Sequence, residues 1–125
     1  MISGDSAALE KILSEIKQNI NDIYAIAVVS QEGLPIASLL PEDMDDIKIA
    51  AITAAMLSLG EKAASELKKG FMEELIVSGE NGYIITVAAG KNAVLTVSIP
   101  TSVKLGLLFH YLKPAAEKIG KLLSG

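Results

Sequence analysis

The chain contains no cysteine and no arginine, and each absence excludes a kind of chemistry. Without cysteine there is neither a disulfide framework nor a thiolate metal site, so we expect a cytoplasmic protein. All 11 basic residues are lysine, which removes bidentate guanidinium chemistry, including an arginine finger donated to a nucleotide's phosphates. Aromatic residues make up only 4% of the chain, so few rings are available to stack on bases or ligands.

Long apolar runs and positive charge are also scarce. The longest uncharged helical stretch, Ile49 to Gly60, falls short of the roughly 20 residues of a membrane span. The start, Met1 to Asp5, lacks the basic and apolar regions of a secretion signal. A net charge of −4 argues against a nucleic-acid surface, which needs a basic face. We therefore expect a soluble protein with no membrane span and no nucleic-acid partner.

What the chain has in abundance is apolar side chains, which form half of its 125 residues. Their spacing predicts a single domain over residues 1–125, in the order helix, two strands, helix, three strands, helix. The predicted elements are a helix over about 9–20, strands over 24–30 and 34–40, a helix from the acidic stretch 42–46 to about 69, strands over 71–78, 83–89 and 93–99, and a helix from 101 or 102 to 123. Asp5 or Ser6 is expected to cap the first helix, and Thr101 or Ser102 the last.

The central helix is apolar around more of its circumference than one buried face requires. One stripe consists of Ile49, Ile52, Met56, Leu59, Ala63 and Leu67, and further apolar positions are Ile47, Ala50, Ala51, Ala54, Ala55 and Leu57. A surface helix needs an apolar stripe only about 100° wide, so this pattern predicts a second buried side, for which another copy of the chain is a candidate partner. The alternative is that the extra face is alanine that tolerates water.

No group of residues has the pattern of a catalytic, cofactor or metal site. His110 has no acid–base partner in the sequence, and Gly90-Lys91-Asn92 lacks the first glycine and the Ser or Thr of a phosphate-binding loop. The acidic stretch 42–46 lacks the ligand spacing of a calcium loop and is better explained as the start of a helix. We therefore expect a protein that is not an enzyme and needs no cofactor.

Three segments resemble one protein family. Val28–Ser38 (VVSQEGLPIAS) is similar to the first hairpin of Roadblock dynein-light-chain proteins, Ala54–Leu67 (AAMLSLGEKAASEL) to their central helix, and Leu105–Leu108 (LGLL) to the entry of their last helix. The resemblance extends over nearly the whole chain, from about Leu9 to Ile119. Each segment alone is common in other folds, and the specificity lies in their order and spacing.

The resemblance implies an α/β (α+β) fold with a five-stranded antiparallel sheet, one long helix on one face and two terminal helices on the other. It also implies a non-enzymatic homodimeric platform for a Ras-like small GTPase, in which third strands pair and central helices pack together. The implied dimer interface comprises Ala51, Ala54, Ala55, Met56, Phe71, Glu73, Leu75 and Val77. The candidate GTPase-docking residues are Lys48, Ser58, Glu61, Lys62, Ser65 and Glu66.

Two alternative functions remain open at this point. Compact α/β domains also bind metabolites between sheet and helix, so a small-molecule sensor module is the second interpretation. Its weakness is the scarcity of polar residues in the predicted strands. A structural light chain in a motor or trafficking complex is the third, and the sequence does not separate it from GTPase scaffolding.

Overall fold

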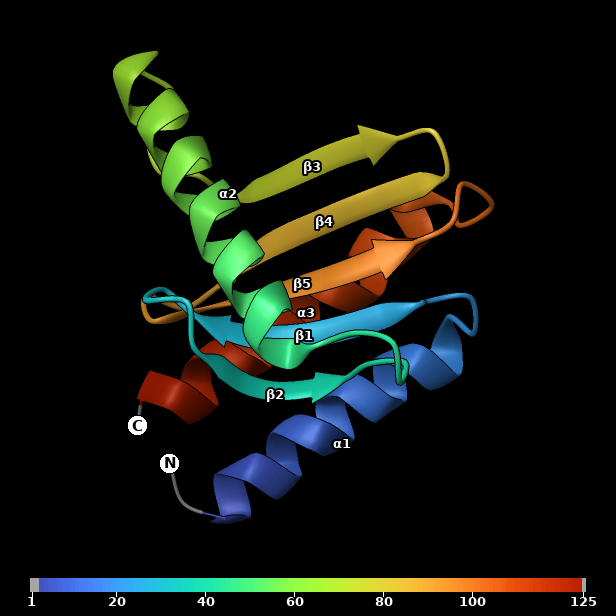
Figure 1. The fold of residues 1–125 in the computed structure, drawn as a ribbon. Helices are drawn as coiled ribbons and strands as arrows, with labels where there is room; N and C mark the ends of the chain where they lie inside the picture. Colours follow the sequence, from blue (N-terminus) through green and yellow to red (C-terminus); the bar gives the residue numbers. More distant parts are fainter. Residues whose placement is uncertain (1–2, 125) are drawn as a thin grey trace.

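The computed structural model describes residues 3–124, which form three helices and five strands (Figure 1). In chain order the elements are α1 (Ser3–Asn19), β1 (Ala25–Ser30), β2 (Pro35–Leu39), α2 (Asp46–Glu66), β3 (Glu74–Gly79), β4 (Gly82–Ala89), β5 (Ala93–Ile99) and α3 (Leu105–Ser124). This is the predicted order, so hydrophobic periodicity and turn residues identified every element by type.

The five strands form one antiparallel sheet in the order β2-β1-β5-β4-β3. β1 lies beside β5 although α2 and two strands separate them in the chain, and Ala25 stands opposite Ser98. The β3–β4 hairpin depends on Gly82, which has φ +147°, and a side chain there would collide with the carbonyl oxygen of Ile99. This order leaves β2 and β3 as the two edges.

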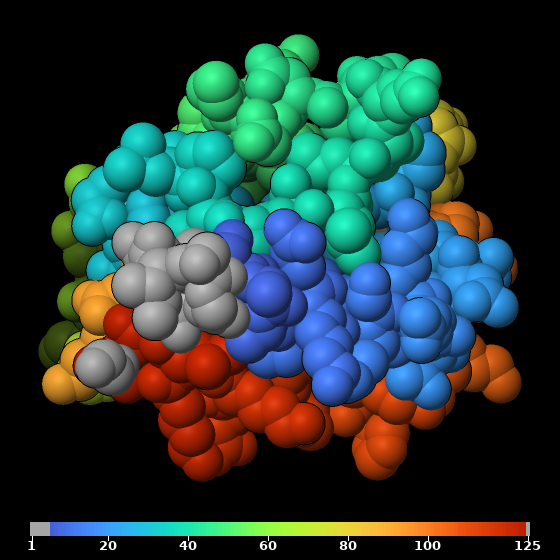
Figure 2. Space-filling model, turned by 90° about the horizontal axis from the view of Figure 1, so that it is seen from below, coloured from blue at the N-terminus to red at the C-terminus, as the bar shows by residue number. Residues whose placement is uncertain are grey.

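The helices lie in separate layers on the two faces of the sheet. α1 and α3 cover one face, and α2 crosses the other diagonally (Figure 1). Seen from below, α2 in green forms the upper layer, while α1 in blue and α3 in red form the lower one (Figure 2). The predicted fold, with one long helix on one face and two terminal helices on the other, is confirmed.

The two faces carry cores of very different size. On the α1 and α3 side, Leu9, Leu13, Leu108 and Leu112 are completely buried among the inward-facing residues of the strands. On the α2 side the buried cluster contains only Ala27, Val29, Ala50, Leu57 and Val94. Burial of apolar area is the main favourable term in folding, so the first face contributes most of the stability.

The ends of α2 are defined by local chemistry. Asp45 is the N-cap, and its carboxylate Oδ1 accepts a hydrogen bond from the amide of Ile47 at 3.0 Å. The helix ends at Glu66, three residues before the predicted end at Lys69, because Lys68 adopts the left-handed conformation with φ 60°. Gly70, also left-handed at φ 86°, completes the turn into the next loop.

Two other predicted boundaries were wrong at the amino-terminal end of an element. α1 begins at Ser3, so Asp5 and Ser6 lie within the helix and neither caps it. The first turn of α1 is mostly polar, so the apolar periodicity did not reveal that the helix begins there. β3 begins at Glu74 and not at Phe71, which lies in the preceding loop with its side chain fully exposed.

The start of the last helix also differs from the prediction. Thr101 and Ser102 form a turn rather than a cap, and α3 begins at Leu105. The amide of Leu108 donates to the carbonyl oxygen of Lys104 at 3.0 Å, which is the helical bond that marks this start. Hydroxyl residues after a proline are as common in turns as at helix caps, so the local sequence did not distinguish the two.

Candidate functional site

The apolar surface of α2 is only partly used inside the chain. The residues that face the sheet are small or few, namely Ala50, Thr53 and Leu57. The larger stripe points sideways, since at about 100° per residue its positions lie roughly a quarter turn from those three. Ile52 is 44% exposed, and Leu59 is 71% exposed. A second apolar side therefore exists, and the structure leaves it uncovered.

The carboxyl-terminal half of α2 extends past the sheet. In Figure 1 the helix crosses β1 and β5 in its first half and continues beyond β3 at its far end. From Ser58 to Glu66 only Gly60 and Ala64 are half-buried, and every other residue is exposed. Leu67, directly after the helix, is 71% exposed. We call residues 58–67 the overhang.

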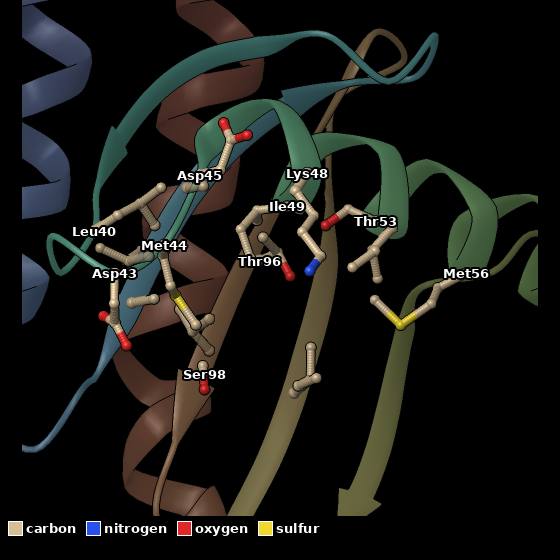
Figure 3. A pocket seen from close by; sticks show the side chains of 16 residues that line it. Leu40, Asp43, Met44, Asp45, Lys48, Ile49, Thr53, Met56, Thr96 and Ser98 are labelled. Atoms are coloured by element: carbon tan, nitrogen blue, oxygen red, sulfur yellow. The ribbon is translucent and has the colours of Figure 1, made fainter.

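Beside the first half of α2 lies an open groove of about 490 Å³ (Figure 3). Its apolar walls come from Ile49, Ile52 and Met56 of the helix and from Ile84 of the sheet. Figure 3 shows Lys48 projecting from α2 toward the strands at this groove. The groove is thus an apolar hollow with one cation at its rim.

The floor and one end of the groove are held by side-chain hydrogen bonds. Thr86 and Thr96, opposite each other on β4 and β5, are buried and joined through their hydroxyls at 2.9 Å. At the end of the groove, the Tyr24 hydroxyl lies 3.1 Å from both carboxylate oxygens of Asp43. This hydrogen bond to Asp43 raises the pKa of Tyr24, with smaller contributions from desolvation and from the charge of Asp43. The phenol stays protonated and connects β1 to the loop before α2.

The opposite flank of α2 borders a second open hollow of about 930 Å³. It is lined by Glu61 and Ser65 of the overhang, by Lys68 and Phe71 of the following loop, and by Lys91 of the β4–β5 turn. Phe71 is 100% exposed at its margin. Phe71 follows Lys68 and Gly70, which are both left-handed, and precedes the edge strand β3. A fully exposed phenylalanine indicates a contact surface more strongly than a single exposed leucine does.

Edge strand β3 is the third uncovered feature. Ile76 and Val77 are exposed on opposite faces of it, although both are β-branched and strand-forming. The other edge, β2, starts with Pro35 and is contacted by both α1 and α2. Proline removes a ladder donor at the start of β2, whereas β3 contains no proline, and α2 contacts it near Gly60.

The structure places the predicted interface residues as follows. Ala51, Ala55, Phe71, Glu73 and Val77 are exposed, while Ala54, Met56 and Leu75 are half-buried. Ala54 faces the β1–β2 turn, where its Cβ lies 3.1 Å from the position that a Cβ on Gly33 would occupy. The predicted GTPase-docking residues Lys48, Ser58, Glu61, Lys62, Ser65 and Glu66 are all exposed on α2.

Sequence reasoning left out several exposed apolar residues that belong to the same surface. Ile52, Leu59 and Leu67 were recognised as a stripe but not named as interface residues. Ile84 was read as an ordinary strand residue, and its position beside α2 was not foreseen. The available signal was the number of large apolar residues in the stripe, because it exceeds the number that the sheet-facing side of α2 can bury.

The described residues show little that could perform acid–base or metal chemistry. Among residues 3–124 no three His, Cys, Asp or Glu side chains gather as metal ligands, and no helix is long and apolar enough to cross a bilayer. His110 is exposed on α3, with its ring edge-on to Tyr111 at a centroid distance of 5.2 Å. The exposed apolar residues of α2 and β3 are the candidate site.

Comparison with known proteins finds relatives in sequence and solved structures of similar fold. The chain is 34% and 33% identical to two uncharacterised proteins of Methanocaldococcus jannaschii, MJ1340 and MJ0310, each over 89% of this chain and 96% of the relative. Its fold is similar to that of Myxococcus xanthus MglB, with a TM-score of 0.89 at 18% identity, covering 99% of this chain and 93% of that one. It also resembles a Roadblock/LC7 domain from Streptomyces avermitilis, with a TM-score of 0.86 at 16% identity over 92% and 97% of the two chains.

The match to a family is direct and covers most of the domain. The Roadblock/LC7 domain family matches residues 9–98, from α1 through nearly all of β5. Proteins of this family are regulators or scaffolds and not known enzymes. With the five-stranded sheet, the α2 face and the edge strand in place, the chain belongs to the Roadblock/LC7 family.

Proposed function

We propose that the protein is a cytoplasmic homodimer that binds a Ras-like small GTPase and regulates or scaffolds it. The observation that carries the dimer is a pair of complementary uncovered surfaces on one chain. The overhang presents the exposed apolar side chains of Leu59 and Leu67, and the groove presents an apolar hollow beside the first half of α2.

A two-fold axis near β3 would satisfy both surfaces at once. In an isologous dimer each patch meets its counterpart on the other copy, so both overhangs would be buried by one symmetry operation. Leu59, Ala63 and Leu67 would then lie over the partner's groove, against its Ile52, Met56 and Ile84. Removing these side chains from water favours association by about 25 cal/mol per Å² of apolar area.

A GTPase would dock on the outer side of the paired α2 helices. Helical spacing directs Lys62 and Glu66 away from the sheet, whereas Ser58, Glu61 and Ser65 turn toward the β1–β2 hairpin. Lys48 lies at the rim of the groove, at the start of the same helix. Such a surface exists only when two copies are together, and one GTPase could contact both. Family membership supports this partner class.

The absence of arginine limits how such a platform could act on hydrolysis. All 11 basic residues are lysine, so no guanidinium can be inserted beside the transferred phosphoryl group. Any stimulation of hydrolysis would come from positioning the GTPase's own residues. The dimer itself is expected to hydrolyse no GTP.

The test is a titration of the dimer with Ras-like GTPases encoded in the same genome, each loaded with GDP or with a non-hydrolysable GTP analogue. Simultaneous charge reversal at Lys48, Glu61 and Lys62 should weaken binding, because these exposed groups surround the proposed docking surface. Reversal of Lys104, Glu117 and Lys118, exposed on or just before α3, is the matched control. Equal losses in the two triple variants would move the docking site away from α2.

The groove also favours a second function, that of a small-molecule sensor. Its volume of about 490 Å³ lies within the usual range of ligand pockets, and Lys48, Thr96 and Ser98 supply a few polar groups. The dimer and a ligand would compete for the same space. A metabolite that raises the melting temperature while dissociating the dimer would favour this alternative over the platform.

A further inference from the structure

The cation at the rim of the groove has no counter-charge within the described part of the chain. Lys48 is exposed and projects from α2 toward the strands (Figure 3). Among the side chains that the structure describes, the one ion pair within 4.0 Å joins Lys113 to Glu74, on the α3 side of the sheet. The ammonium of Lys48 is therefore available to an anion from outside the chain.

The carboxylates that line the same groove already have hydrogen-bond partners. Asp43 accepts from the Tyr24 hydroxyl at 3.1 Å, and Asp45 accepts from the amide of Ile47 at 3.0 Å as the N-cap of α2. A cationic ligand would have to compete with these bonds, whereas an anionic ligand meets an ammonium without a carboxylate. The charges around the groove therefore favour a negatively charged ligand.

The remaining walls of the groove offer apolar contact. Ile52 is 44% exposed, Ile84 is 38% exposed, and Met56 adds a flexible thioether that adapts to irregular shapes. The Thr96 hydroxyl is paired with Thr86 at 2.9 Å, and among the described residues no buried side-chain nitrogen or oxygen lacks a hydrogen-bond partner. A sugar or a nucleotide would leave several of its own polar groups unsatisfied here, which is costly.

We propose that the groove binds an aliphatic carboxylate, with the carboxylate at Lys48 and the chain along Ile52, Met56 and Ile84. One lysine matches the single charge of a carboxylate, whereas a phosphate monoester carries about −1.5 to −2 at pH 7. Lys48 and Met56 are about 12 Å apart along the axis of α2, the length of an extended chain of about ten carbons. The groove volume of about 490 Å³ is within the usual range of ligand pockets.

This inference rests on the proposed homodimer and makes the groove its regulatory site. In that dimer the overhang of one copy lies over the groove of the other and contacts the same apolar walls. The overhang side chains assigned to this contact, Leu59, Ala63 and Leu67, carry no charge and give Lys48 no counter-charge. A carboxylate supplies that charge and its chain takes the space of the overhang, so the ligand and the second copy exclude each other. The ligand therefore dissociates the dimer and removes the surface on which a GTPase would dock.

Mutual exclusion determines the size of the effect. Each chain released from the dimer exposes one groove, and the ligand binds the released chain only. At a ligand concentration ten times its Kd for the single chain, the dimer Kd rises about elevenfold for each groove and about a hundredfold for both.

The test uses three probes that share one chain and differ in the head group, namely decanoate, decanol and decyltrimethylammonium, each below its micelle-forming concentration. Calorimetry measures their binding, and sedimentation equilibrium measures the dimer Kd with and without each probe. Decanoate should bind at least tenfold more tightly than the other two and should raise the dimer Kd about a hundredfold at ten times its own Kd.

Two single variants locate the carboxylate. Lys48→Met keeps an apolar stem and removes the ammonium, so it should weaken decanoate binding at least tenfold and leave decanol binding unchanged. Lys91→Met removes a lysine from the second hollow and is the matched control, which should change neither. The dimer Kd of each variant without probe is measured as well, so that an effect on association itself is recognised.

Decanoate that binds no better than decanol, or equally well to Lys48→Met, would overturn the carboxylate site, and so would loss of binding in Lys91→Met. Binding of decanoate with an unchanged dimer Kd would overturn the exclusion. Failure of the homodimer has a different signature. A chain that is monomeric without any probe refutes the dimer and its regulation, while decanoate binding to that monomer, lost in Lys48→Met, would still support the carboxylate site.

Discussion

The two faces of the sheet use apolar side chains for different purposes. The face beneath α1 and α3 buries branched residues such as Leu9 and Leu108 completely. The face beneath α2 buries mostly small residues, and the large ones, Ile52 and Leu59, remain exposed. The difference teaches that the main core lies on the first face, whereas the second face keeps large apolar side chains exposed, which the proposed association would cover.

The largest effect is expected from a substitution in the core beneath α1 and α3. Leu108→Ala removes a completely buried side chain and should lower the free energy of unfolding by about 2–5 kcal/mol. Leu107→Ala, next to it and 48% exposed, is the matched control and should cost well under half as much. Chemical denaturation measures both, and equal losses would mean that α3 does not carry the main core.

A substitution on the face covered by α2, which we call the open face, should weaken dimerisation and leave the free energy of unfolding of the chain nearly unchanged. Leu59→Asp would place a charge where the overhang is expected to meet the partner's groove, and burying an unpaired carboxylate is costly. We expect dimerisation to weaken by at least about tenfold in sedimentation equilibrium. Ser58→Asp, on the neighbouring exposed position, controls for added charge. A dimer unaffected by Leu59→Asp would exclude the overhang from the interface.

The polar floor of the open face should respond in a non-additive way. Thr96→Val leaves the buried hydroxyl of Thr86 without its partner at 2.9 Å and should cost about 1–3 kcal/mol of stability. The double variant, with valine at both positions, should recover most of that loss because no polar group is stranded. If the double variant is less stable than Thr96→Val alone, the hydroxyls have another partner.

The sequence predicted every element of the fold, and it predicted that α2 has more apolar surface than one face needs. It did not show which side of α2 meets the sheet. Apolar patterns usually place the largest residues inward, but here the sheet contacts Ala50 and Leu57 while the stripe of larger residues lies at the flank. The reason is tertiary, because α2 packs on Ala27 and Val29 through Ala50 and Leu57, and this contact is set by the position of the helix on the sheet and not by the apolar pattern of the helix alone.

Local conformation explains what the sequence missed around β3. The run from Phe71 has strand-like composition, but left-handed residues at Lys68 and Gly70 redirect the chain, so pairing with β4 begins only near Glu74. A lysine at positive φ has no reliable sequence signal. The exposure of Ile76 and Val77 likewise depends on β3 being an edge, which is a property of strand order and not of the strand itself.

The measurement that tests the central claim most directly is the mass of the wild-type protein in solution by light scattering, across the micromolar range. If the open face is an interface between copies, the mass will be twice the 13.1 kDa of one chain and will hold on dilution to low micromolar concentration. A stable mass of 13.1 kDa throughout that range would contradict the account, because the exposed apolar residues of α2 and β3 would then have no second copy to cover them.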